Sequence, residues 1–267
     1  MRTHTSIAGR RPSGRRHPLA TVALITIGLL TTGGAYALLS TSATAESTAA
    51  SQQSITEGQK VFAANCASCH GLSAMGTDKG PSLYGVGASS VDFQMGTGRM
   101  PLAFQGPQGA EKPLQFTQEQ IDAVADYIAS LAPGPAIPDE KWLKGDGDIA
   151  LGGQLFRTNC AMCHNVAGAG GALTEGKFAP SLAGVEARHI YEAMETGPQN
   201  MPVFSDLNLS PQDKADIISF LKYQQEHSSV GGVDLGGLGP VAEGLFIWIF
   251  GLGAIVGVTI WITARPN

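Results

Sequence analysis

The longest apolar run of the chain lies close to its C-terminus. Residues 245–264, LFIWIFGLGAIVGVTIWITA, carry no charge, and a run of this length can cross the hydrocarbon core of a bilayer. Trp248 and Trp261 stand near its two ends, where interfacial aromatic residues are enriched. A helix packed against a soluble core would show an amphipathic stripe, and this run has none. The pattern predicts a transmembrane helix over residues 243–264.

A second apolar run, residues 19–39, follows a basic leader at residues 1–18. Glycine and threonine dilute this run, and the Ala43-Thr44-Ala45 behind it resembles an A-x-A signal-peptide cleavage site. The run is long for the apolar part of a signal peptide and nearly long enough to span a membrane. A cleaved signal peptide and a retained N-terminal anchor therefore both stay open.

Between the two runs, two amphipathic patterns predict helices with defined starts. Thr117 and Gln120 form a Thr-x-x-Gln capping box, and apolar residues follow at i, i+3 and i+4 spacing: Ile121, Val124, Tyr127, Ile128 and Leu131. The second helix begins at the N-cap Ser210, with Pro211 at its first position, and continues through Ile217, Ile218, Phe220 and Leu221. No strand pattern of any length appears, so an all-α fold is expected.

Each of these helices closes one copy of an internal repeat. The first copy contains EGQKVFAANCASCHG at residues 57–71, which is similar to GGQLFRTNCAMCHN at 152–165 in the second copy. It also contains PSLYGVG at 81–87, which is similar to PSLAGVE at 180–186. Further along, RMP in the first copy matches NMP in the second. The chain therefore contains two related units.

The segment at residues 132–147 separates the two units. Its prolines and its Gly-Asp pairs are typical of a semi-rigid linker. This division predicts domains at residues 55–131 and 148–227. Units of this size bury little apolar surface by themselves, so each is expected to need a covalent link or a cofactor at its core.

Charge is unevenly distributed about the apolar runs. Of the 17 basic residues, five precede the first run and Arg265 follows the second. Because arginine and lysine mark cytoplasmic flanks, both ends are predicted to be cytoplasmic at the cell membrane, with the region between them outside. That region is acidic, since it holds nearly all of the 22 Asp and Glu residues. An acidic surface argues against nucleic acid as a partner.

The four cysteines occur in two matching hexapeptides, NCASCH at 65–70 and NCAMCH at 159–164. An oxidising compartment favours disulfides, but bonding within Cys-x-x-Cys is strained and leaves both histidines unexplained. A thioredoxin-like pair would lie in a βαβ unit, which the pattern lacks. Zinc would not account for a histidine directly after each pair.

The motif C-x-x-C-H accounts for every one of these residues. Two thiols add to the vinyl groups of haem, and the residue that follows them lies under the iron. We therefore predict two covalently bound haem c groups, attached through Cys66, Cys69, Cys160 and Cys163, with His70 and His164 as proximal ligands of the iron.

A haem that carries electrons also needs a sixth ligand, and methionine raises the reduction potential while closing the iron to substrates. Met100 and Met201 hold equivalent positions in the repeat, and each precedes a proline. This equivalence predicts them as the axial ligands, with the nearby Met95 as the main rival to Met100. The other methionines lack such a repeat partner, and gap filling in a small core is expected of them: Met75, Met95, Met162 and Met194.

Each unit resembles a class I cytochrome c domain, with C-x-x-C-H on an N-terminal helix, a proline loop, a Met-Pro loop and a closing helix. The resemblance implies that the carbonyl groups of Pro81 and Pro180 orient the proximal histidines, as outer-sphere partners do. The second unit departs from the pattern by a Gly-rich insert, NVAGAGGALTEGKFAP. The expected fold is all-α, with two tandem class I cytochrome c domains, a C-terminal transmembrane helix and an N-terminal signal or anchor helix.

The complete order of segments is similar to that of the dihaem cytochrome c subunits of actinobacterial cytochrome bc complexes. That resemblance implies an electron-transfer subunit of a menaquinol:cytochrome c reductase, with cytochrome b and a Rieske iron–sulfur protein as partner subunits. Electrons would pass from the Rieske protein to a cytochrome c oxidase in the same supercomplex. No catalytic site is expected in this chain, because neither apolar run holds an acid or histidine for quinol or proton chemistry.

Two other functions are compatible with a dihaem chain. One is the electron-accepting subunit of a membrane-bound dehydrogenase. The other is a dihaem peroxidase, an enzyme in which one iron would lack its methionine ligand. Spectra and partner proteins discriminate between these alternatives.

Overall fold

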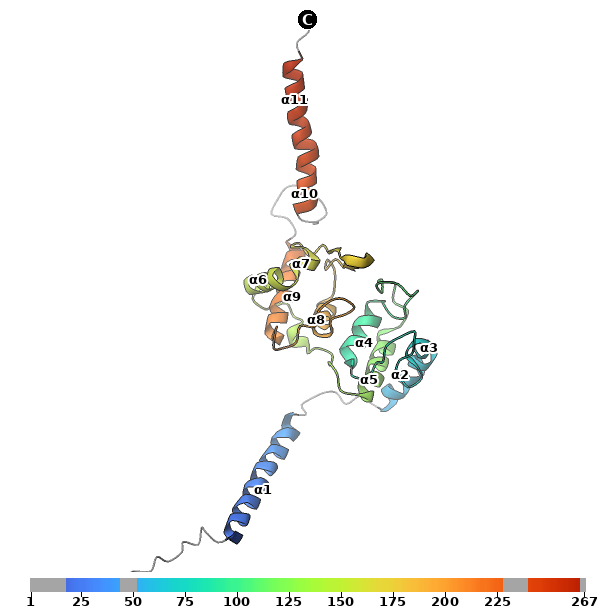
Figure 1. Cartoon of the computed structure of the whole chain (residues 1–267), viewed down its shortest axis with the longest axis vertical. Helices are drawn as coiled ribbons and strands as arrows, with labels where there is room; N and C mark the ends of the chain where they lie inside the picture. The colour runs from blue at the N-terminus through green and yellow to red at the C-terminus, as the bar shows by residue number, and fades with distance from the viewer. Residues whose placement is uncertain (1–17, 44–51, 228–239, 265–267) are drawn as a thin grey trace, which may run out of the picture. The chain divides into compact units, whose positions relative to one another are not determined.

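The computed structural model describes residues 18–43, 52–227 and 240–264, and Figure 1 shows their helices. Residues 1–50 and 51–267 form two separate compact units. The described part of the first unit is one helix, α1 (Pro18–Ala43), built from the first apolar run. The second unit contains the two related halves of the chain and the C-terminal apolar helix.

The first half is built around two crossed helices, α2 (Gln52–Asn65) and α5 (Gln118–Leu131). The short α3 (Ala67–His70) continues from α2, and α4 (Gly87–Gly96) packs on α5. Phe62 of α2 and Tyr127 of α5 are buried, with their ring centroids 5.4 Å apart. The apolar face predicted for α5 is thus the face that forms this core.

The second half repeats this arrangement with α6 (Ile149–Asn159), α7 (Ala161–His164), α8 (Ala187–Thr196) and α9 (Pro211–Glu226). The ring centroids of Phe156 of α6 and Phe220 of α9 are 5.6 Å apart, and this pair corresponds to Phe62 and Tyr127 of the first half. A short 3-10 helix, η2 (Glu140–Trp142), precedes this half, and the following Leu143 is buried in its core.

Both predicted helix starts are confirmed. The Thr117 side chain accepts a hydrogen bond from the Gln120 amide, and the Gln120 side chain accepts one from the Thr117 amide. Ser210 and Asp213 form the same reciprocal box at the start of α9, with Pro211 at its first position. Such a cap stabilises a helix by about 1 kcal/mol.

One glycine in each half allows the crossing helices to touch. A Cβ on Gly58 of α2 would lie 1.9 Å from the Ala123 carbonyl oxygen of α5. A Cβ on Gly152 of α6 would lie 1.9 Å from the Asp216 carbonyl oxygen of α9. Because the opposing atoms are backbone, no side-chain movement can make room, and only glycine fits at this distance.

Three features were not predicted from the sequence. The helices α4 and α8 follow the PSL segments of the two halves, and the insert of the second half contains a small antiparallel hairpin. This hairpin pairs β1 (Gly171–Ala172) with β2 (Phe178–Ala179) across a 3-10 turn, η3 (Thr174–Gly176). Strands this short leave no alternation in a sequence, so the absence of a strand pattern did not exclude them.

The C-terminal apolar run is helical from Pro240 to Thr263. It comprises α10 (Pro240–Phe246), a π-helical segment η4 (Ile247–Leu252) and α11 (Gly253–Thr263). Among the described residues, Ala242–Thr263 is the one helix long and apolar enough to cross a membrane, and the described apolar part of α1, Leu19–Gly34, is shorter.

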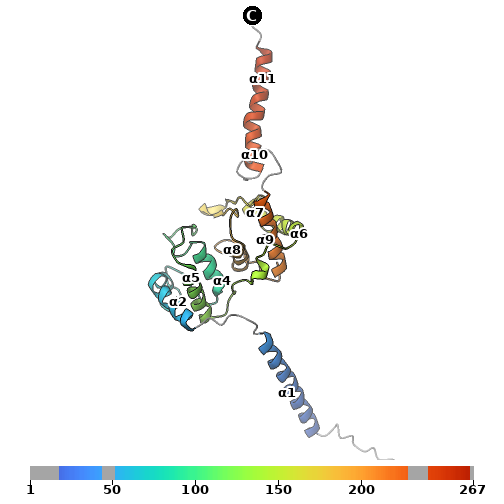
Figure 2. The ribbon, with the colours of Figure 1, turned by 180° about the vertical axis from the view of Figure 1, so that it is seen from behind.

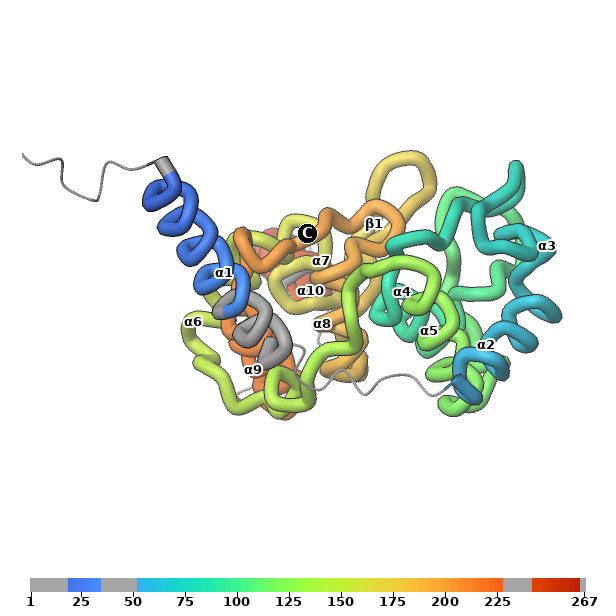
Figure 3. Tube along the Cα trace, turned by 90° about the horizontal axis from the view of Figure 1, so that it is seen from below, coloured from blue at the N-terminus to red at the C-terminus, as the bar shows by residue number. Residues whose placement is uncertain are grey.

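The two halves contact each other through α4 and α8. Figure 2 shows these helices from behind, and Figure 3 shows the course of the chain around them from below. A second set of contacts joins loops. The Gln108 side chain both donates to the Phe178 carbonyl and accepts from the Phe178 amide, and Gln199 pairs in the same way with Gly109.

Candidate haem sites

Each C-x-x-C-H motif forms one tight helical turn at the end of the first helix of its half. In the first half, the amides of Cys69 and His70 donate to the Cys66 carbonyl at 3.1 and 3.0 Å. In the second half, the amides of Cys163 and His164 donate to the Cys160 carbonyl at 3.1 and 2.9 Å. The turn therefore places both thiols and the histidine of a motif on one short segment.

All four thiols are free, and the sequence contains no other cysteine. Burial, with a smaller contribution from the neighbouring cysteine, raises the pKa of Cys66 and of Cys160 to about 11. A redox-active Cys-x-x-Cys pair has the opposite property, a lowered thiol pKa next to positive charge or a helix N-terminus. The environment of these cysteines argues against a thioredoxin-like site.

Both motif histidines are held by a proline carbonyl. His70 Nδ1 lies 2.7 Å from the Pro81 oxygen, and His164 Nδ1 lies 2.9 Å from the Pro180 oxygen. Because a carbonyl only accepts, Nδ1 carries the proton and Nε2 keeps a free lone pair for a metal. The insert of the second half leaves the local backbone alike, since the amide of Gly170 donates to the His164 carbonyl at 2.8 Å, as that of Gly76 does to His70. The expected proline–histidine contacts are confirmed in both halves.

A cavity of about 730 Å³ opens beside the second motif. Its walls include Cys160, Cys163, His164 and Met201. His164 and Met201 also line a smaller recess, whose other walls are mostly apolar, with Phe156, Leu182, Ile190 and Leu221 among them. A site of this volume is within the range of pockets that enclose large cofactors.

In the first half, Met100 and Cys66 both pack against the hydrophobic core formed by α2, α4 and α5. Met95 is more deeply buried, at 5% exposure, and lies on α4 within the same core. Met95 and Met100 therefore both contact the core against which Cys66 packs. Only the repeat equivalence with Met201 favours Met100 as the ligand.

The other methionines divide into two kinds. Met95 and Met194 lie at matching positions of α4 and α8, and both are buried in a hydrophobic core. The expectation that they lack a repeat partner is wrong, because both stand at the same distance behind the PSL segment. The expectation of gap filling is confirmed for this pair and is wrong for Met75 and Met162, whose side chains are exposed.

The donor sets fit covalently attached haem. Each half offers two unpaired thiols, an imidazole with a free Nε2, and a methionine beside an apolar core. Thioether formation uses thiols, and iron takes imidazole and thioether ligands. Each half thus contains the residue types that attach and ligate a haem group.

Residues of the first half also line the larger cavity beside the second motif. Phe93, Arg99, Gln108 and Lys112 line part of its wall, together with Gln199 from the second half. The two reciprocal glutamine contacts hold this wall in place. Sequence reasoning did not select either glutamine, because an exposed Gln in a loop carries no signal until its partner is known.

The fold and its paired sites define two cytochrome c domains in tandem. Comparison with protein families agrees, since residues 55–132 match the family "Cytochrome c" and residues 147–221 match "Cytochrome C oxidase, cbb3-type, subunit III". The second of these matches covers the second domain alone.

Several curated proteins are similar to nearly the whole chain. The "Cytochrome bc1 complex cytochrome c subunit" of Mycobacterium tuberculosis is 42% identical over 99% of this chain and 97% of its own length. The protein of the same name from Corynebacterium efficiens is 41% identical over 94% of this chain and 90% of its own length. The chain belongs to the family of cytochrome bc1 complex cytochrome c subunits.

Family membership agrees with a membrane-anchored cytochrome that relays electrons. The dehydrogenase-subunit and peroxidase alternatives are not favoured by these relatives, whose names place them in a bc1 complex.

Proposed function

We propose that the chain carries two covalently bound haem c groups. Cys66 and Cys69 form the thioether links of the first group, and Cys160 and Cys163 form those of the second. His70 and His164 supply the proximal ligand, each held by the proline carbonyl behind its ring. When bound, haem supplies the one-electron chemistry of its iron, and the chain determines ligation, burial and position.

Met100 and Met201 are the proposed distal ligands. Met201 lines the same recess as His164, as does Met194, and its repeat equivalence with Met100 selects Met201. Met100 packs on the first core at the equivalent step of the repeat. Thioether ligands favour the reduced iron and block access of substrate, as an electron carrier requires.

The proposed domains are residues 55–131 and 148–227, joined by the linker 132–147. Both lie on the extracytoplasmic side of the cell membrane, because the basic residues flank the apolar runs on their outer ends. The C-terminal helix anchors the chain, and both termini are cytoplasmic if the leader is retained.

The proposed role is electron relay within a menaquinol:cytochrome c reductase. Electrons enter from the Rieske iron–sulfur protein and leave toward a cytochrome c oxidase in the same assembly, with cytochrome b as a further partner subunit. The chain itself supplies no quinol or proton site, so turnover belongs to the assembled complex. The observation that carries the proposal is the duplication of one complete ligand set in a chain with an apolar C-terminal helix.

Copurification tests this role. We expect the tagged chain, extracted in a mild detergent, to bring a b-type cytochrome and a Rieske protein with it. Reduced-minus-oxidised spectra would then show b- and c-type bands together, and addition of a menaquinol analogue would reduce the c-type haems.

An unrelated tagged protein with a single membrane span, extracted in the same way, serves as the control for trapping in detergent micelles. Recovery of a soluble dehydrogenase in place of cytochrome b would contradict the reductase assignment. A high-spin ferric spectrum with rapid peroxide turnover would support the peroxidase alternative instead.

A further inference from the structure

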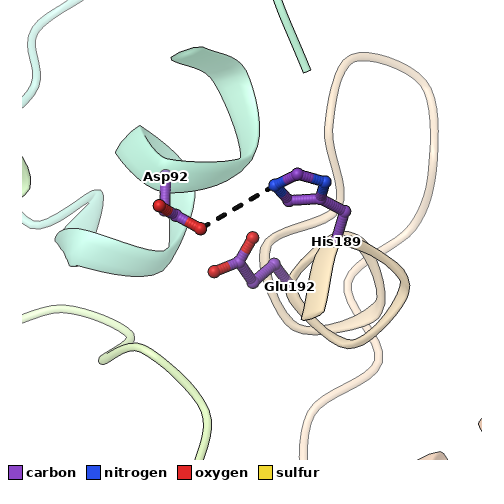
Figure 4. A group of neighbouring side chains, drawn as sticks. All are labelled: Asp92, His189 and Glu192. Atoms are coloured by element: carbon purple, nitrogen blue, oxygen red, sulfur yellow. Dashed lines mark ion pairs between the residues drawn. The ribbon is translucent and has the colours of Figure 1, made fainter. Parts of the chain in front are cut away.

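A group of three ionisable side chains, two of them buried, lies where the two domains meet. None of the three is a proposed haem ligand, although His189 also lines the larger cavity beside the second motif. Asp92 comes from α4, while His189 and Glu192 lie one turn apart on α8 (Figure 4). One ligand atom from each residue lies within 4.8 Å of the other two. Asp92 Oδ2 and His189 Nε2 are 3.9 Å apart.

The two carboxyl groups are almost completely removed from solvent. Asp92 is 1% exposed and Glu192 is 0% exposed. Gln118 donates a hydrogen bond to Asp92 Oδ1 at 3.2 Å. Asp92 Oδ2 and both oxygens of Glu192 receive no hydrogen bond from the part of the chain that the structure describes. Buried carboxyl oxygens without a donor are costly, so this group calls for a proton or a cation.

Nearby positive charge is loosely placed. Arg188 Nη1 lies 3.7 Å from Asp92 Oδ2, and the same guanidinium lies 3.8 Å from the exposed Glu140. Arg99 is directed elsewhere, over the ring of Phe93. The arginines therefore donate no hydrogen bond to the buried oxygens of Asp92 and Glu192 that lack a donor.

The imidazole of His189 is suited to bind a metal ion. The side chain of His189 is 14% exposed, and its Nε2 faces Asp92 Oδ2. Gly96 of α4 makes room for this ring, because a Cβ there would lie 2.8 Å from His189 Nε2. A neutral imidazole keeps a lone pair that a metal can accept.

We propose that Asp92, His189 and Glu192 bind one divalent transition-metal ion, with Zn²⁺ as the representative ion. One imidazole and two carboxylates suit zinc, whereas calcium and magnesium prefer oxygen ligands alone. Small side-chain rotations bring three atoms that lie within 4.8 Å of one another to the zinc–ligand distance of about 2.0–2.1 Å. The ion satisfies the oxygens that lack donors and joins the two cytochrome c domains at α4 and α8.

The test uses the full chain with its haem attached, treated with a chelator and then dialysed against ZnCl₂. We expect one zinc ion per chain by elemental analysis, and a higher melting temperature with zinc than with chelator, because the ion binds the folded state. His189→Gln and Asp92→Asn should each weaken zinc binding by more than about tenfold, the lower range found for changes to outer-sphere partners.

Glu192→Gln distinguishes loss of zinc binding from loss of folding. The amide keeps the shape of the side chain and gives Asp92 a donor, so the variant should fold without metal and lose the zinc-dependent rise in melting temperature. His227→Gln is the matched control, because His227 is an exposed histidine at the end of α9. Haem absorption spectra confirm that each variant is folded.

Retention of zinc by His189→Gln, or its loss in His227→Gln, would place the metal elsewhere and overturn the proposal. So would a wild-type chain that binds no zinc and whose stability depends on pH alone, because Asp92 and Glu192 would then share a proton.

Discussion

At the scale of single residues, the proline behind each motif histidine decides what the ring can do. The carbonyls of Pro81 and Pro180 hold the Nδ1 protons of His70 and His164 at hydrogen-bond distance. This contact fixes the tautomer and leaves Nε2 available to bind a haem iron. The sequence identified both histidines by motif, and the matched contacts show that the two sites are built alike.

The methionines provide a test at the same scale. Met201→Ala should remove the near-infrared methionine band of one haem and lower its reduction potential, because the thioether stabilises reduced iron. Met194→Ala should keep the band and lower the free energy of unfolding by about 2–5 kcal/mol, since Met194 is a buried core residue. Optical spectra, redox titration and thermal unfolding separate the two outcomes.

The first domain offers the corresponding pair. Met100→Ala should remove the near-infrared methionine band of one haem and lower its reduction potential, as expected for Met201→Ala. Met95→Ala should keep the band and lower the free energy of unfolding, as expected for Met194→Ala. If Met95→Ala removed the band and Met100→Ala retained it, the ligand assignment in the first domain would be wrong.

The candidate metal residues show the limit of single-residue reasoning. Asp92, His189 and Glu192 belong to no motif, and Asp92 is about one hundred positions away from the other two. Only the packing of α4 against α8 brings them together. The one local signal is the i, i+3 spacing of His189 and Glu192, which is meaningful only once this segment is known to be helical.

At the scale of elements, the crossing of the first and last helix organises each domain. Capping boxes and apolar periodicity determine where α5 and α9 start and which faces they bury. The glycines at the crossings determine how closely the partner helices approach. The sequence predicted the former, because caps and periodicity are local. It did not predict the latter, because a glycine inside a helix does not identify the backbone it will meet.

Gly152→Ala tests this crossing. The added Cβ would overlap the Asp216 carbonyl, so the variant should lose about 1–3 kcal/mol of the free energy of unfolding. Circular dichroism during thermal unfolding of the full chain in detergent measures the change.

Gly153→Ala is the neighbouring control on α6. Its Cβ would meet the ring of Phe220 at 3.0 Å, a side chain that can shift, and alanine favours the helix by about 1 kcal/mol over glycine. Equal destabilisation by both variants would show that the backbone contact at Gly152 has no special role.

At the scale of the whole molecule, the chain combines two cytochrome c domains with an apolar C-terminal helix. The domains meet through α4 and α8 and through the paired contacts of Gln108 and Gln199. This second set of contacts lies at the wall of the cavity beside His164. The first domain is thus part of the surroundings of the second site.

Membrane attachment is testable at this scale. With residues 1–43 replaced by a secretion signal that is certain to be cleaved, the chain should remain in the membrane fraction after a carbonate wash, because Ala242–Thr263 can cross the bilayer. The same protein without residues 240–267 should be recovered in the soluble fraction with its haem attached.

Recovery of the truncated protein with the membranes would show that another part of the chain, or a partner protein, retains it. Haem staining of both fractions after electrophoresis provides the measurement, and a soluble periplasmic-type protein expressed in parallel controls for incomplete washing.

The sequence by itself determined the features that depend on neighbours along the chain. These are the two C-x-x-C-H motifs, the repeat, the helix caps, the amphipathic faces and the apolar runs, because each can be recognised from the order of residues without knowing which distant groups meet. The tertiary structure decided which distant groups meet: the proline carbonyls with the histidines across an insert, the crossing helices at Gly58 and Gly152, and the carboxyl groups and histidine between α4 and α8. Such meetings depend on how helices pack, and packing is a property of the whole fold.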